Sequence, residues 1–226
     1  MSKGPSGHFP DGPFDILQSM SKGCHMENSR SLPDWNTLYD QQKVEDMPWY
    51  HEELDPDISR FLSDSGITEG SILDLGTGPA TQALALAGRG FRVTATDVSE
   101  TAIRLGREKA AASGLDINFL VDDILAVKIQ GPFDIVIDRG CFHVFAPPLR
   151  SVFVKNLSSL IDSGGLFFLK TFSHKETRPD GPYRFSIKQI IEYFAGSFEL
   201  LQAWDSQYQG TLKELPLALC AVLRKI

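Results

Sequence analysis

Two glycines and two aspartates stand at intervals that suit the binding of a nucleoside. Gly76 and Gly78 follow a short apolar run, and Asp97 comes 21 residues after Gly76. Glycine lets a backbone turn tightly and approach a ligand that a Cβ atom would exclude. An acidic residue about 20 positions further on accepts hydrogen bonds from ribose hydroxyls in nucleotide-binding folds. Downstream, Asp123 and Ile124 offer an acceptor for an exocyclic amine and an apolar surface for a purine ring.

A second group of polar residues follows the apolar run 133–137 and contains Asp138, Arg139 and His143. A cation such as Arg139 can raise the ionised fraction of a bound thiol, or bind a carboxylate. His143 can take a proton from a neutral group of a bound ligand. Two plainer interpretations stay open: Arg139 forms an ion pair with Asp138 or another acid at the strand end, and His143 is a hydrogen-bonded structural residue.

Apolar runs and helix caps predict the elements that position these residues. The predicted strands cover residues 71–75, 92–97, 117–121, 133–138, 166–171, 198–203 and 217–223. The predicted helices cover residues 35–42, 57–65, 81–87, 100–113, 147–160 and 187–194. Strands that alternate with helices form a parallel sheet with right-handed crossovers, and a last pair joined without a helix forms a hairpin. We therefore predict an α/β fold with a doubly wound, seven-stranded, mostly parallel sheet whose last strand is antiparallel.

The composition is that of an ordinary globular protein with an acidic balance. The 226 residues include 22 Lys and Arg against 29 Asp and Glu, a formal net charge of −7. An excess of acid argues against nucleic acid or an anionic membrane surface as the main partner. Three cysteines without a Cys/His cluster predict neither a disulfide framework nor a metal site, and no apolar leader is present, so we expect a cytoplasmic protein. We expect residues 1–30 to be a flexible arm and residues 31–226 to form one domain, with a lid at 31–55.

The region from about residue 72 to the C-terminus resembles the class I S-adenosylmethionine-dependent methyltransferases. The stretch 73–78, which reads LDLGTG, is similar to the first motif of that family, and the stretch 94–99, TATDVS, to its second. The resemblance implies that S-adenosylmethionine is the cofactor, that Gly76 and Gly78 flank its methionyl part, and that Asp97 binds the ribose. It also implies that the adenine lies beside Asp123 and Ile124. We assign three further residues to the same site: Asp74, Val98 and Asp138.

The substrate side resembles the thiopurine and thiol/halide methyltransferases. The Asp-Arg-Gly step at 138–140 is similar to that of the first group, and the stretch 181–186 to both. Upstream, the stretches 35–39 and 48–49 are similar to the tryptophan-bearing lid of these enzymes. The resemblance implies that Trp35 and Trp49 cover the cofactor and that Arg139 faces the acceptor. The residues that we expect to bind substrate are Arg139, Phe142, Tyr183 and Arg184.

These expectations favour methyl transfer to a small-molecule acceptor, a thiol or another soft nucleophile, by in-line displacement. Methylation of oxygen or nitrogen with His143 as base is one alternative, and a non-catalytic cofactor-binding module on the same fold is another. Arsenite methylation would need Cys24, Cys141 and Cys220 to converge on the metalloid. We expect a monomer or a weak homodimer.

Overall fold

The computed structural model describes residues 33–226, so the expected arm at 1–30 and the first two residues of the expected lid lie outside the described part. Its helices follow the predicted order along the chain. The α-helices are α2 (Trp35–Gln41), α3 (Pro56–Asp64), α4 (Thr81–Ala87), α5 (Glu100–Ser113), α6 (Pro147–Leu160) and α7 (Ile187–Phe194). Three short 3₁₀ helices, which sequence patterns did not indicate, are η1 (Val44–Asp46), η2 (Ile124–Ala126) and η3 (Phe142–Val144).

The strands form one sheet in the order β3-β2-β1-β4-β5-β8-β7, and the short β6 pairs with β5 outside this path. They are β1 (Ser71–Leu75), β2 (Arg92–Asp97), β3 (Ile117–Val121), β4 (Phe133–Arg139), β5 (Ile161–Ser173), β6 (Arg184–Phe185), β7 (Phe198–Gln207) and β8 (Leu217–Lys225). β8 runs antiparallel between β5 and β7, and the other neighbours on the path are parallel. The doubly wound sheet with an antiparallel last strand is therefore confirmed, with the two-residue β6 in addition.

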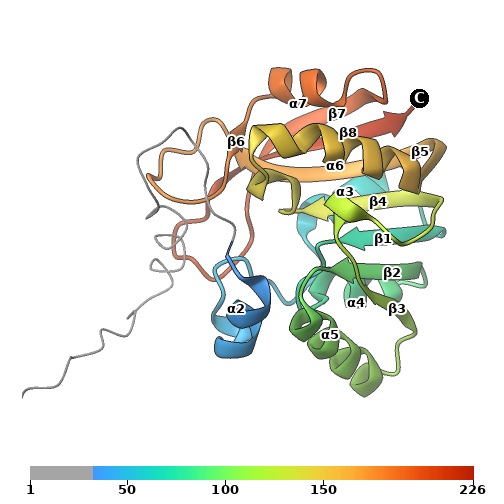
Figure 1. The fold of residues 1–226 in the computed structure, drawn as a ribbon, viewed down its shortest axis with the longest axis vertical. Helices are drawn as coiled ribbons and strands as arrows, with labels where there is room; N and C mark the ends of the chain where they lie inside the picture. The colour runs from blue at the N-terminus through green and yellow to red at the C-terminus, as the bar shows by residue number, and fades with distance from the viewer. Residues whose placement is uncertain (1–32) are drawn as a thin grey trace, which may run out of the picture.

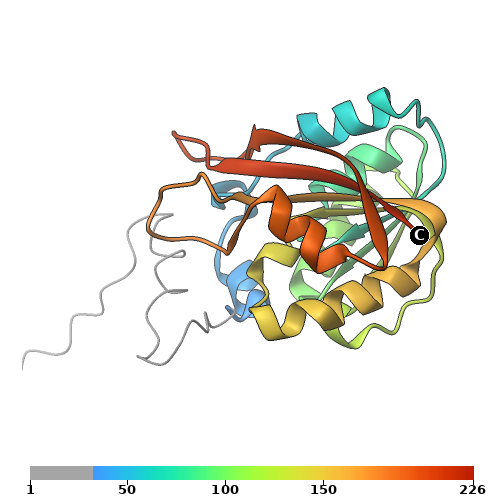
Figure 2. The same cartoon turned by 90° about the horizontal axis from the view of Figure 1, so that it is seen from above.

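Helices cover both faces of the sheet, as a mostly parallel sheet requires. One core cluster joins β-strand residues to α6 and α7, and the other joins the alternate strand residues to α3, α4 and α5. Adjacent residues of β5 show the alternation, because Phe167 belongs to the first cluster and Phe168 to the second. Figure 2 shows α6 and α7 on the side of the sheet opposite α3.

The helix starts follow from local chemistry. Ser99 caps α5 by accepting a hydrogen bond from the N–H of Ala102, and Ser186 caps α7 with Gln189 in a capping box. Pro56 occupies the first turn of α3, where its missing N–H is not needed. Because α4 and α5 begin just after the parallel strands β1 and β2 end, the loops before these helices lie at one edge of the sheet. The helix α2 lies beyond the carboxyl ends of β1 and β2 (Figure 1).

Candidate functional site

A cavity of about 420 Å³ opens at the carboxyl edge of the sheet. It brings together residues from the ends of β1, β2 and β4, from α2, and from the loop that joins β7 to β8. A second cavity of about 50 Å³ lies beside it, between the glycine loop after β1 and the segment that follows α2. Of the predicted site residues, those that line the larger cavity are Trp35, Trp49, Gly76, Asp97, Val98, Asp123, Ile124, Arg139 and His143.

The glycine loop after β1 has a backbone that only glycine adopts without strain. Gly76 and Gly78 have φ values of 66° and 53°, in the left-handed region. A Cβ atom on Gly76 would lie 3.0 Å from the Cβ of Cys141, and one on Gly78 would lie 2.8 Å from Oη of Tyr39. Gly78 lines the smaller cavity. The loop, which we name the cradle, therefore packs closely against Cys141 and Tyr39 and borders both cavities.

Asp74 anchors this loop through a hydrogen bond from Thr77. Its carboxylate accepts a 2.5 Å hydrogen bond from Oγ1 of Thr77, and the residue is 2% exposed. Burial raises the pKa of Asp74 to about 6, although the hydrogen bond from Thr77 opposes the rise. Asp74 lines the smaller cavity and not the larger one.

Asp97 stands at the end of β2 and points both oxygens at backbone donors. Oδ2 accepts from the N–H of Gly78 at 2.9 Å, and Oδ1 accepts from the N–H of Ser99 at 2.9 Å. Burial raises the pKa of Asp97, while these backbone donors act in the opposite direction. Each carboxylate oxygen keeps a lone pair, so Asp97 can accept further hydrogen bonds from a diol in the cavity.

The two aspartates after β3 have different roles. Asp122 accepts hydrogen bonds from the N–H groups of Lys128 and Ile129 and so fixes the chain that follows. Asp123 caps η2 through the N–H of Leu125 at 2.9 Å. Both line the cavity together with Ile124, which is 5% exposed. This end of the cavity pairs an acidic acceptor with an apolar wall.

Three aromatic residues of the expected lid cover the cavity. Trp35 stacks on Tyr39 with ring centroids 6.5 Å apart, and meets the edge of Trp49 at 6.2 Å. All three rings line the larger cavity. Oδ1 of Asn36 accepts hydrogen bonds from Oγ of Ser99 and from the N–H of Thr101, so α2 is anchored to the start of α5.

The loop between β7 and β8 contacts the lid segment that carries Trp49, and we name these two segments together the cover. Thr211 donates from its N–H to the carbonyl of Pro48 and from Oγ1 to the carbonyl of Met47. A Cβ atom on Gly210 would lie 1.9 Å from the carbonyl oxygen of Pro48, so the two backbones touch there. Leu212 and Pro216 of this loop line the cavity. Sequence patterns gave no indication that this loop belongs to the site.

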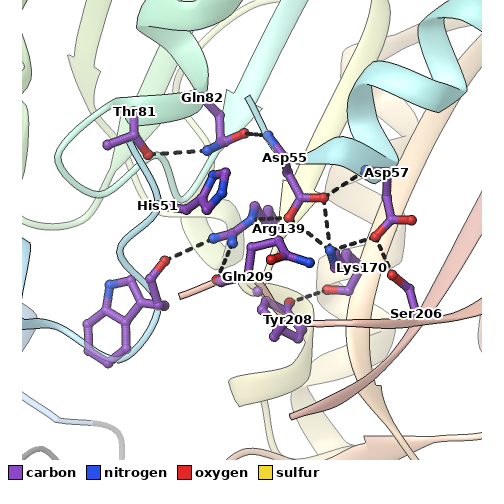
Figure 3. A network of polar contacts seen from close by, with 12 residues as sticks. His51, Asp55, Asp57, Thr81, Gln82, Arg139, Lys170, Ser206, Tyr208 and Gln209 are labelled. Atoms are coloured by element: carbon purple, nitrogen blue, oxygen red, sulfur yellow. Dashed lines mark hydrogen bonds and ion pairs between the residues drawn. The ribbon is translucent and has the colours of Figure 1, made fainter. Parts of the chain in front are cut away.

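Arg139 connects the cover to the sheet, and of the two interpretations left open above its contacts match an ion pair and not a free cation (Figure 3). Its Nε donates to Asp55 at 2.6 Å, Nη1 to the carbonyl of Trp49 at 3.1 Å, and Nη2 to the carbonyl of Gln209 at 2.6 Å. The side chain is 8% exposed. The positive charge of Arg139 is therefore paired with Asp55 and not offered to an acceptor, although its side chain lines both cavities.

The ion pair is part of a buried four-charge cluster, which we name the Asp55 cluster: Asp55, Asp57, Arg139 and Lys170. Nζ of Lys170 lies 2.8 Å from both carboxylate oxygens of Asp55 and 2.7 Å from Oδ2 of Asp57. Burial opposes the charge on both aspartates, but the cations outweigh it and lower both pKa values. Nε1 of Trp204 and Oγ of Ser206, both in β7, donate hydrogen bonds to the carboxylate of Asp57. Because two carboxylates face two cations, the net charge of the cluster is zero.

Asp138, which we expected to contribute to the cofactor site, accepts hydrogen bonds from the loop after β4 and lines neither cavity. Oδ1 accepts from the N–H groups of Gly140 and Cys141, and Oδ2 from that of Phe142. Burial raises the pKa of Asp138 to about 7, against these three donors. Its observed contacts make it the residue that shapes the loop.

His143 lies in the wall of the cavity, but its contacts do not suit the base that we considered. Nδ1 accepts a hydrogen bond from the N–H of Phe172 at 3.2 Å. Burial, and next the charge of Arg139, lower the pKa of His143 to about 3. A ring with this pKa has little tendency to take a proton from an acceptor at neutral pH.

The other residues expected to bind substrate lie outside the cavity. Phe142 is fully buried among aromatic rings, including Phe153 and Phe194. Tyr183 stacks on the guanidinium of Arg150, and Arg184 donates to the carbonyls of residues 178 and 180. The sequence positions of these three residues, after a strand or within an insertion, did not indicate the residues that they contact. The structure offers His143, Phe145, Phe172, Tyr208 and Leu212 as lining residues instead.

The cysteines do not form a set in the described part of the chain. Cys141 lines the cavity, where burial raises the pKa of its thiol, whereas Cys220 belongs to the core. Cys24 lies outside the described residues. Within 33–226, His, Cys, Asp and Glu side chains form no group of three that could hold a metal ion. No helix in that range has the length and apolar character needed to cross a bilayer.

The cradle, the carboxylate of Asp97 and the aromatic cover together fit S-adenosylmethionine, since they offer main-chain approach, a ribose acceptor and ring surfaces. Residues 72–165 match the family described as "Methyltransferase domain". An uncharacterised methyltransferase of Schizosaccharomyces pombe is 34% identical over 104 residues, which cover 46% of this chain and 72% of that protein. The chain belongs to the S-adenosylmethionine-dependent methyltransferases.

Two further relatives extend the comparison of this methyltransferase. A 2-heptyl-1-hydroxyquinolin-4(1H)-one methyltransferase of Mycobacteroides abscessus is 31% identical over 149 residues, 64% of this chain and 65% of that protein. A probable thiol methyltransferase of Arabidopsis thaliana is 24% identical over 163 residues, 71% of this chain and 72% of that protein.

Solved structures agree with the fold. A structure described as "Conversion of a Disulfide Bond into a Thioacetal Group during Echinomycin Biosynthesis" has a TM-score of 0.74 at 26% identity and covers 84% of this chain and 91% of its own. A 1,6-didemethyltoxoflavin-N1-methyltransferase of Burkholderia thailandensis, with bound S-adenosylhomocysteine, has a TM-score of 0.63 at 18% identity and covers 94% and 86%.

Proposed function

We propose that the methyltransferase transfers a methyl group to a small molecule whose acceptor atom is a thiol sulfur or another soft nucleophile. One observation carries this proposal. The cavity that Asp97 and Asp123 line is also lined by the apolar side chains of Phe145, Phe172 and Leu212. Such a cavity, apolar with a few polar groups, suits a small ligand.

The relatives support a small acceptor and include sulfur chemistry. The names of one relative and one solved structure refer to a thiol and to the conversion of a disulfide into a thioacetal. Others act on a hydroxyquinolone and on a toxoflavin precursor. Oxygen and nitrogen acceptors are therefore the second candidate for this chain.

The residues of the chain contribute mainly by positioning. S-adenosylmethionine supplies an electrophilic methyl group when it is bound. Asp97 holds a ribose from one side, Asp123 and Ile124 border an adenine, and the glycine loop accommodates the methionyl part. Trp35 and Trp49 exclude water from above, and Arg139 fixes the segment that carries Trp49. Alignment of donor and acceptor in a dry cavity lowers the barrier without acid–base help when the acceptor is already nucleophilic.

A panel of acceptors tests the proposal. Small thiols, halides, phenols, N-hydroxy heterocycles and amines are incubated with the enzyme and methyl-labelled S-adenosylmethionine, and the products are identified by mass spectrometry. We expect methylation of thiols with higher kcat/KM than of phenols or amines of matched size. Turnover of amines or phenols alone would reject the soft-nucleophile assignment.

A further inference from the structure

One ring nitrogen of His143 forms a hydrogen bond within the described part of the protein, and the other does not. Nδ1 accepts the N–H of Phe172, so this nitrogen carries a lone pair and the proton of the neutral ring is on Nε2. Nε2 has no hydrogen-bond partner among the residues that the structure describes, and it is not among their fully buried unpartnered atoms. The residue is 7% exposed and lines the cavity. The exposed nitrogen is thus an N–H donor that faces the cavity.

Gly140 marks the place where this donor is accessible. A Cβ atom on Gly140 would lie 3.2 Å from Nε2 of His143 and 3.1 Å from Oη of Tyr208, so the two polar atoms border the same small space. Oη of Tyr208 donates its own hydrogen to the carbonyl of Lys170 at 2.6 Å. Of the two atoms, Nε2 of His143 can therefore still donate a hydrogen bond into this space, whereas Oη of Tyr208 can only accept one.

The surroundings keep the ring neutral. Arg139 lies near His143 and opposes a second positive charge, and burial acts in the same direction. Asp138 faces the loop donors, and the thiol of Cys141 and the phenol of Tyr208 both have pKa values raised by burial. A neutral Nε2–H tautomer donates but cannot accept a proton at Nε2.

We propose that His143 is a specificity-determining residue whose Nε2–H donates a hydrogen bond to a lone pair or negative charge on the acceptor substrate. The proposal rests on the proposed methyl transfer and names its substrate class. Acceptors are apolar molecules whose nucleophilic group is ionised at working pH or holds a free lone pair. An anionic acceptor would form its new bond to the methyl carbon with its own electron pair and become neutral. The bond between that carbon and the sulfonium sulfur of the donor would break with its pair left on the sulfur, which becomes a neutral thioether, so no proton is transferred to the enzyme. A neutral hydroxyl must lose a proton, and His143 does not take it.

The first test is kinetic and uses two acceptors from the panel, one with a pKa above the assay pH and one below it. We expect the inflection of kcat/KM against pH to move with the pKa of the acceptor. His143→Leu should lower kcat/KM about 10- to 100-fold for the ionised acceptor, the range for one hydrogen bond to a charged group. His143→Gln, which keeps an amide N–H, should recover most of it. His174→Gln, an exposed histidine, is the control.

Two kinetic results would overturn the proposal. One is an inflection that stays fixed for both acceptors and disappears in His143→Leu, which would make His143 a base. The other is an unchanged kcat/KM in a folded His143→Leu enzyme. Calorimetric titration with S-adenosylmethionine should give the wild-type affinity in each variant, which separates acceptor effects from cofactor effects.

The second test needs no acceptor. Long-range ¹H–¹⁵N NMR of the labelled wild-type enzyme reports the tautomer and charge of each histidine. We expect His143 to stay in the neutral Nε2–H form from about pH 5 to pH 9, and a neutral Nδ1–H form or a titration near pH 6.5 would overturn the proposal. If the panel gives no product while this form is observed, the proposed acceptor class fails and the donor geometry of His143 stands.

Discussion

Replacing Arg139 by methionine removes one cation from the Asp55 cluster and two hydrogen bonds from the cover of the cavity. Asp55 is fully buried, and Arg139 binds it at 2.6 Å. Removing one partner of a buried ion pair typically destabilises a protein by about 3–5 kcal/mol, because a charge is left uncompensated. For a domain of this size that corresponds to a fall in Tm of roughly 6–20 °C.

The same substitution should weaken cofactor binding, because the carbonyls of Trp49 and Gln209 lose their donor. Hydrogen bonds to charged groups are worth about 1.5–3 kcal/mol each. If one such bond holds the cover closed over S-adenosylmethionine, its Kd rises about 10- to 100-fold. Thermal unfolding by circular dichroism and isothermal titration calorimetry measure the two effects on one preparation.

Lys170→Met is the matched control. Lys170 is fully buried and pairs with Asp55 and Asp57, but it donates to neither Trp49 nor Gln209. It should lower the Tm by a similar amount and leave the Kd of the folded enzyme within about threefold of wild type. Equal Kd values for Arg139→Met and wild type, or equal losses in both variants, would refute the positioning role of Arg139.

Three further predictions concern the cofactor site and the cluster. Asp97→Ala should weaken S-adenosylmethionine binding at least about tenfold in calorimetry, since it removes a charged acceptor; unchanged affinity would reject Asp97 as the ribose ligand. Gly78→Ala should lower stability by about 1–2 kcal/mol in urea unfolding, because φ is +53°, and reduce cofactor affinity through contact with Tyr39. Stability should fall as pH drops below about 4, because cations hold the folded-state pKa of Asp55 below its unfolded value and the unfolded chain binds protons first. Asp55→Asn should show a shallower acid limb in the same melts, and parallel limbs would contradict this source of acid sensitivity.

The sheet was predictable because its signals are local. The strands β1, β2 and β3 have the predicted bounds, since each is a short apolar run between turn residues. β5 is longer than predicted because it begins at Ile161, directly after α6, and its register with β4 shifts between Phe133 and Ile135. A shift of that kind depends on pairing between strands and leaves no pattern within one strand.

The Asp55 cluster was missed because its partners are far apart in the sequence. Lys170 is 115 residues from Asp55 and 113 from Asp57. One signal was present, since Lys170 interrupts the apolar run of β5, and a lysine in a buried strand requires a partner. Identification of that partner needed the fold, which brings the start of α3 against β5.

Arg139 and His143 show the same limit at the site itself. Both residues lie at the carboxyl end of β4 and line the cavity, but their positions in the sequence do not fix which of their atoms remain available. The carboxylate of Asp55 pairs with the positive charge of Arg139. The N–H of Phe172 donates to Nδ1 of His143, the nitrogen through which the ring would act as a base. The chemistry left to the chain is enclosure, alignment and one N–H donor. Enclosure and alignment do not depend on a particular acceptor atom, so the N–H donor of His143 is the contact that we expect to distinguish acceptors by their charge.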